Sequence, residues 1–113
     1  MHEFGIAENI LEAAQEAARA NGARRIEVVR VRVGALSGVV EEALRFAFDS
    51  LANGTPAAGA RLEIEPAPVR CYCDGCNTEF AATPLHYECP ACGRASSDIR
   101  GGRELNLIAI EVS

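Results

Sequence analysis

Two pairs of cysteines constrain the fold of this chain more than any other feature of its sequence. Cys73 and Cys76 are separated by two residues, twelve residues follow, and Cys89 and Cys92 repeat the first spacing. Each pair can form a tight knuckle that directs two thiolates at one metal ion, and the loop between the pairs can bring the knuckles together. The spacing therefore predicts a four-thiolate structural metal site, with zinc as the favoured metal and iron as the alternative.

The segment around these cysteines, residues 69–103, has the composition of a small metal-dependent module. Its large apolar side chains are few, chiefly Phe80, Leu85, Tyr87 and Ile99. A structural zinc ion contributes on the order of 10 kcal/mol to folding, so we expect this segment to need its metal. Because four protein ligands leave no position for a substrate, such a site is expected to hold its metal rather than to react.

Cys71 is the fifth cysteine and falls outside the paired pattern. If it replaced Cys73 as a ligand, the first knuckle would have to span four residues instead of two. We therefore interpret Cys71 as a spare thiol near the entrance of the module. The second pair also favours metal binding over a redox dithiol, which needs only one pair.

The rest of the chain predicts an α+β fold. Apolar residues recur at helical spacing over 4–21 and again over about 39–51. They alternate with polar residues over 25–33 and 61–65, which is typical of strands. Pro66 ends the second strand or places it at a sheet edge. These patterns predict two helices packed on a small three-stranded sheet.

The third strand of that sheet is expected from the C-terminal stretch. Residues 104–112 carry apolar side chains on both faces, which favours a central position in the sheet. The C-terminal strand would then return to the first sheet, and the metal module would be an insertion. We expect one domain from residues 1–68 plus 104–113 and a zinc-ribbon-like module over 69–103.

The charge of the chain argues against several classes of function. The 113 residues carry a formal net charge of −5, and all 11 cationic residues are Arg. Chemistry that depends on a lysine Schiff base or a P-loop lysine is therefore excluded. Residues 70–103 hold four Arg and four acidic residues, so they offer no basic stripe for nucleic acid. Contact with other proteins is the favoured use of the module.

The remaining composition indicates a cytoplasmic protein that is not an enzyme. No stretch approaches the roughly 18 apolar residues of a membrane span, and the first residues lack the pattern of a secretory signal. Five cysteines, an odd number, fit a reducing compartment better than a disulfide framework. Two distant His and five Ser without a nucleophile elbow form no catalytic constellation. We expect a monomer or homodimer with no membrane association.

The first three residues suggest a second metal site. The α-amine of Met1, the amide nitrogen of His2 and the His2 imidazole can close adjacent chelate rings on one ion. Such an in-plane nitrogen set favours square-planar Ni(II) or Cu(II), and Glu3 could add a donor or orient the imidazole. The plain alternative is a disordered start in which Glu3 is only a charge at a helix end.

The combination of motifs resembles the HypA/HybF family of hydrogenase nickel-incorporation proteins over essentially the whole chain. The motifs, in chain order, are Met1-His2-Glu3, the turn Val33-Gly34-Ala35-Leu36-Ser37, and the cysteine pattern Cys73, Cys76, Cys89-Pro90 and Cys92. The resemblance implies a nickel metallochaperone whose Ni(II) ligands are Met1 and His2, assisted by Glu3. It also implies that zinc is held by the four paired cysteines.

The resemblance further implies the partners of the chain. Members of the family work with a maturation GTPase to load nickel into the large subunit of [NiFe]-hydrogenase, and some also serve urease. Some members carry His residues beside the zinc knuckles, and His86 is the only histidine near them here. The alternative hypothesis is a zinc-ribbon adaptor that recruits proteins without transferring nickel.

Overall fold

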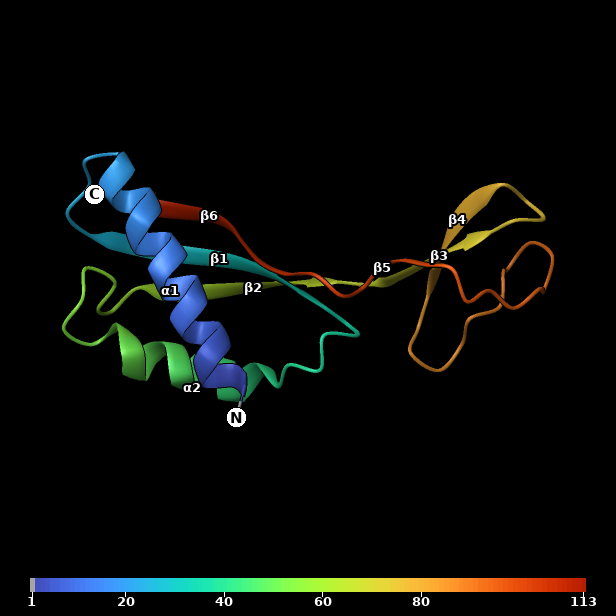
Figure 1. Cartoon of the computed structure of the whole chain (residues 1–113), viewed down its shortest axis with the longest axis horizontal. Helices are drawn as coiled ribbons and strands as arrows, with labels where there is room; N and C mark the ends of the chain where they lie inside the picture. The colour runs from blue at the N-terminus through green and yellow to red at the C-terminus, as the bar shows by residue number, and fades with distance from the viewer. Residues whose placement is uncertain (1) are drawn as a thin grey trace. The chain divides into compact units, whose positions relative to one another are not determined.

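The computed structural model describes residues 2–113, which form the two helices and six strands of an α+β fold. Figure 1 shows the elements in chain order. They are α1 (His2–Ala20), β1 (Ile26–Gly34), α2 (Glu41–Ala52), β2 (Arg61–Ala67), β3 (Val69–Cys73), β4 (Thr78–Ala82), β5 (Ile99–Gly101) and β6 (Leu105–Val112). The strands form two three-stranded sheets, in the orders β2-β1-β6 and β4-β3-β5. The predicted fold class is confirmed.

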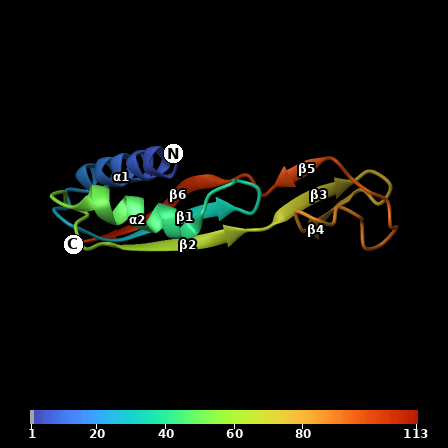
Figure 2. The same cartoon turned by 90° about the horizontal axis from the view of Figure 1, so that it is seen from below.

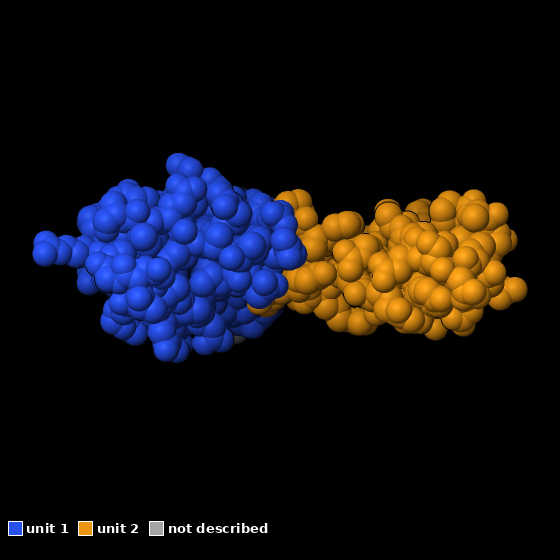
Figure 3. Space-filling model, turned by 90° about the horizontal axis from the view of Figure 1, so that it is seen from above, with its two compact units in different colours: residues 1–32, 39–65, 106–113 blue, residues 33–38, 66–105 orange. Residues whose placement is uncertain are grey.

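The chain divides into two compact units, which Figure 3 shows in two colours. The first unit takes residues up to 32 together with 39–65 and 106–113. The second unit takes residues 33–38 and 66–105, and it contains all five cysteines. The assignment of nickel to the first unit and of zinc to the second unit stays a prediction.

Helix α1 begins at His2, two residues before the expected start. It buries one stripe of small and aliphatic side chains and ends where Gly22 adopts a left-handed φ of 66°. The buried stripe consists of Ala7, Ile10, Leu11, Ala14 and Ala18. The opposite face is polar, so α1 is amphipathic. No helix in residues 2–113 is long and apolar enough to cross a membrane.

Strands β1 and β2 form a parallel βαβ unit with α2 as the connection. Arg30 pairs with Glu63 at 2.7 Å, and Arg32 pairs with Glu65 at 2.8 Å. The partners advance together along both strands, so the strands run in the same direction. The unit also explains why α2 packs against α1, since a crossover helix must cover the sheet.

Strand β6 lies at an edge of the first sheet, so the expectation of a central C-terminal strand was wrong. The centre is taken by β1, and β2 occupies the other edge with Pro66 inside it. β6 does return to the first sheet as predicted, and Arg25 and Ser113 exchange backbone hydrogen bonds beside its end. The apolar residues on both faces of β6 are only half-buried, so its pattern did not require neighbours on both sides.

The second sheet is a small antiparallel one built around β3. Figure 2 shows β3 between β4 and β5. Its register pairs Cys71 with Phe80 and Cys73 with Thr78 across β4. The core beneath the sheet is small, and three of its five buried residues are cysteines: Val69, Cys71, Cys73, Phe80 and Cys89.

Candidate metal sites

The four paired cysteines come together in the second unit. Cys73 is the last residue of β3, Cys76 and Cys92 lie in turns, and Cys89 directly precedes the turn that contains Cys92. The Sγ atoms all lie within 4.8 Å of one another, with Cys73 to Cys92 at 3.6 Å and Cys76 to Cys89 at 3.9 Å. Four thiolates about 2.3 Å from one tetrahedral ion are separated by about 3.8 Å, so the arrangement fits zinc. All five cysteines are free of disulfides.

The two knuckles share a local backbone conformation that the sequence makes possible. Asn77 follows Cys76 and has a φ of 53°, while Gly93 follows Cys92 and has a φ of 75°. Asn and Gly are the residues that most readily adopt this left-handed conformation. The chain can therefore turn directly after the second cysteine of each pair.

Backbone hydrogen-bond donors face the sulfur atom of Cys89 in the second knuckle. The N–H groups of Cys92 and Ala91 lower the pKa of Cys89 to about 7, because they stabilise its thiolate. Hydrogen bonds with the sulfurs of Cys92, Cys73 and Cys89, Cys92 first, raise the pKa of Cys76 to about 12, because they stabilise its protonated thiol. A divalent cation would displace these shared protons and bind the thiolates, which is why such a group of sulfurs favours a bound metal.

The fifth cysteine is part of the core rather than a spare thiol at the entrance. Cys71 is completely buried beneath the second sheet, and burial raises the pKa of its thiol. His86 is exposed, and its Nδ1 lies 3.9 Å from the carboxylate of Glu88. The structure does not place either residue in the group of four sulfurs.

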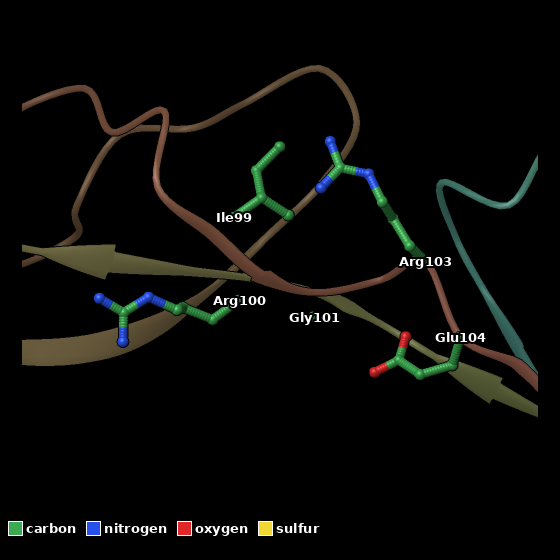
Figure 4. A pocket seen from close by; sticks show the side chains of 5 residues that line it. All are labelled: Ile99, Arg100, Gly101, Arg103 and Glu104. Atoms are coloured by element: carbon green, nitrogen blue, oxygen red, sulfur yellow. The ribbon is translucent and has the colours of Figure 1, made fainter.

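The second unit also has a shallow hollow away from the sulfurs. Its volume is about 230 Å³, and it is lined by Ile99, Arg100, Gly101, Arg103 and Glu104 (Figure 4). In Figure 4 the side chain of Arg103 extends toward Ile99, whereas Arg100 points to the other side of the strand. The hollow contains no cysteine or histidine, so it is separate from the candidate metal sites.

The predicted nickel ligands lie at the start of α1 in the first unit. The His2 side chain is 60% exposed, and its Nε2 lies 3.6 Å from Oε2 of Glu3. Glu3 is itself buried, and Oε2 accepts a hydrogen bond from the backbone N–H of Val40 at 3.1 Å. That bond lowers the pKa of Glu3 below its usual value of 4.5, although burial acts in the opposite direction. Met1, the third predicted ligand, lies outside the described residues.

Sequence reasoning missed the contacts that the start of α1 makes with α2 and its N-cap residue. Val40 caps the N-terminus of α2, and it is largely exposed although apolar. Phe4 and Phe46 form an edge-to-face pair with ring centroids 6.3 Å apart, and Phe46 is 67% exposed. Nothing in the local sequence connects α1 with the start of α2, because the contact depends on how the helices pack.

Comparisons with known proteins agree with this architecture. The sequence profile of the family described as "Hydrogenase/urease nickel incorporation, metallochaperone, hypA" matches residues 1–112. The hydrogenase maturation factor HypA of Chloroflexus aurantiacus (strain J-10-fl) is 50% identical over 112 residues, which is 98% of each chain. The protein of the same description from Picosynechococcus sp. is 45% identical over 112 residues, which is 99% of each chain.

Two solved structures have the same fold. The solution structure of the Ni metallochaperone HypA from Helicobacter pylori matches with a TM-score of 0.72 and 26% identity, covering 99% of this chain and 97% of that one. A second solution structure, of HypA protein, matches with a TM-score of 0.75 and 27% identity, covering 100% of this chain and 97% of that one.

Fold and sulfur geometry define the class as a small α+β protein with a four-cysteine metal-binding module. Within that class, the chain belongs to the HypA family of nickel metallochaperones for hydrogenase maturation.

Proposed function

We propose that this chain binds Ni(II) at its N-terminus and delivers it during the maturation of [NiFe]-hydrogenase. The observation that carries the proposal is the arrangement at the start of α1, where an exposed imidazole lies beside a buried carboxylate. A site for transferable metal must be open to an acceptor, and His2 meets that requirement because its side chain is 60% exposed.

The donors of the proposed site are nitrogen atoms. The His2 amide lies in the first turn of α1, where backbone N–H groups have no partner within the helix. This amide nitrogen is therefore free to bind the cargo together with the His2 imidazole and the α-amine of Met1. Nitrogen sets of this kind suit Ni(II) in a square-planar geometry.

We assign Glu3 a positioning role in this site. Its Oε2 accepts the Val40 N–H and lies near Nε2 of His2, so the carboxylate is held in place from the side of α2. A fixed carboxylate beside a ligating imidazole orients the ring and makes it a stronger ligand. The sequence left open whether Glu3 binds the metal itself or orients the His2 imidazole, and this geometry favours the second role.

The four cysteines would hold zinc permanently. Zinc bound by four thiolates has no open position and contributes folding energy to the module that contains it. Cys73, Cys76, Cys89 and Cys92 would be the ligands, and the spacing of their sulfurs suits that ion. One metal is thus held and another is handed on.

Delivery needs partners, and we propose a maturation GTPase and the hydrogenase large subunit, with urease as a further acceptor. The family description supports protein partners in nickel incorporation. Phe4 directly follows Glu3 in the chain and pairs with Phe46, and both rings are exposed, so an acceptor that covers the pair would also reach the nickel. We place this exchange in the cytoplasm.

A Ni(II) titration of protein with its native N-terminus tests the proposal. His2→Ala should abolish binding of one nickel ion, while the matched change His86→Ala should leave it intact, because His86 is the other histidine of the chain. A version extended at the N-terminus should also lose nickel, since its α-amine is displaced. Unchanged nickel affinity in His2→Ala would favour the adaptor hypothesis instead.

A further inference from the structure

An arginine side chain lies directly against the first cysteine knuckle. The guanidinium of Arg94 packs over Gly75, between the two cysteines of that knuckle. Its Nη1 and Cζ lie 3.1 and 3.3 Å from the point that a Cβ of Gly75 would occupy. The glycine thus leaves room for the guanidinium, and Arg94 lines a hollow of about 150 Å³ together with Cys73 and Asp74.

Arg94 has no acidic partner within residues 2–113, a property it shares with Arg103 but not with Arg70 or Arg100. Arg70 pairs with Glu79 at 3.2 Å, and Arg100 pairs with Asp98 at 2.8 Å in the same unit. Within residues 2–113 the Arg94 side chain makes neither an ion pair nor a hydrogen bond, and Asp74 does not come within ion-pair distance of it. Its backbone carbonyl accepts the N–H of Cys89 at 2.9 Å, which anchors the residue to the second knuckle as well.

A four-thiolate site creates a charge that such a cation could offset. Four thiolates and one divalent ion have a net charge of −2. Cys92 is exposed, so its thiolate can be reached by protons and electrophiles. We propose that Arg94 is a positioning residue that compensates this charge and thereby slows the loss of metal from the four cysteines. The inference rests on the proposed zinc site.

Two consequences follow from the placement of the guanidinium. The positive charge lowers the electron density on the thiolates, so they react more slowly with alkylating reagents. The stabilisation is electrostatic and partly exposed to solvent, so added salt should weaken it. A side chain that only packs against the knuckle would produce neither effect.

The test measures the rate at which zinc moves from the whole chain to a chromogenic chelator, at low and high salt. Arg94→Gln should release zinc about tenfold faster at low salt, and Arg94→Lys should restore most of the difference. Arg103→Gln is the matched control, because Arg103 lies in the same unit and lines the other hollow (Figure 4). Alkylation of the zinc-bound protein by iodoacetamide should accelerate in Arg94→Gln but not in Arg103→Gln.

The outcomes separate this inference from the proposed zinc site. If the wild-type chain holds no metal on its cysteines, the zinc site itself fails. If zinc binds but Arg94→Gln and Arg103→Gln release it at the wild-type rate, only the role of Arg94 is overturned. The role of Arg94 would also be overturned if Arg94→Gln released zinc faster at every salt concentration and Arg94→Lys did not return the rate toward that of the wild type. Loss of packing, rather than loss of charge, would then be the cause.

Discussion

Glu3 and Val40 are 37 residues apart in the chain, yet one hydrogen bond joins them. The bond places a carboxylate beside the N-terminus of α2, where the helix dipole favours negative charge. Val40 has no side-chain oxygen of its own with which to cap that helix, so Glu3 supplies the acceptor from another element. This contact could not be predicted from sequence, because no local pattern marks a cap that comes from a distant helix.

The lowered pKa of Glu3 predicts an acid-dependent loss of stability. The unfolded chain binds a proton at the usual value near 4.5, above the pKa of Glu3 in the folded state. The contribution of Glu3 is therefore present above pH 4.5 and is lost as the pH falls through the folded pKa. Thermal melts between pH 3 and 7 should show a smaller acid-induced fall in Tm for Glu3→Gln than for the wild type. Glu8→Gln, an exposed change on the same helix, should leave the fall unchanged.

The five cysteines should separate into four metal ligands and one thiol that only packs. Cys71→Val puts a somewhat larger apolar side chain in a completely buried position, so it should cost about 1–3 kcal/mol and leave the zinc content unchanged. Cys73→Ser should lose zinc, because it removes one of four sulfurs that lie together. Metal analysis of both variants measures the difference, and zinc loss in Cys71→Val alone would reverse the assignment.

At the scale of elements, periodicity predicted most of the fold and failed where pairing decides. The helices and the strands β1 and β2 lie within a few residues of the predicted ranges. The position of β6 was wrong, because apolar residues on two faces indicate burial but not which strands are neighbours. The parallel pairing of β1 with β2 was not predicted. It became clear only from the ion pairs Arg30–Glu63 and Arg32–Glu65, which join the two strands in the structure.

Two glycine substitutions should have opposite effects on stability. An added Cβ at Gly34 would overlap the carbonyl of Gly102, so Gly34→Ala should destabilise the chain by at least about 2 kcal/mol. Gly5 lies inside α1 with open space around it, so Gly5→Ala should stabilise by up to about 1 kcal/mol. Urea unfolding at fixed zinc concentration measures both changes. Equal midpoints for the two variants would contradict the close approach of Gly34 to Gly102.

At the scale of the whole molecule, the two units should depend differently on metal. The first unit buries aliphatic side chains from two helices and a sheet, including Leu44, Phe48 and Val31. Three of the five core residues in the second unit are cysteines, and two of them, Cys73 and Cys89, are proposed metal ligands, so its folding should require the proposed ion. The cysteine spacing predicted this module and its ligands, but the size of its core became clear only from the structure.

Removal of metal should therefore unfold the second unit and spare the first. After chelation, amide hydrogen exchange should accelerate in β3, β4 and β5, while α1 and α2 keep their protection. Far-UV circular dichroism should retain the helical signal. Loss of protection in α1 at the same chelator concentration would show that the first unit also depends on the metal.

A competition experiment measures whether the chain keeps zinc on its cysteines while it releases nickel from its N-terminus, as proposed. Protein with its native N-terminus is loaded with one zinc and one nickel ion, a chelator is added, and the release of each metal is followed with time. Nickel should leave at least about tenfold faster while zinc stays on the cysteines. Release of zinc before nickel, or of both at one rate, would show that the chain does not hold one metal and transfer the other.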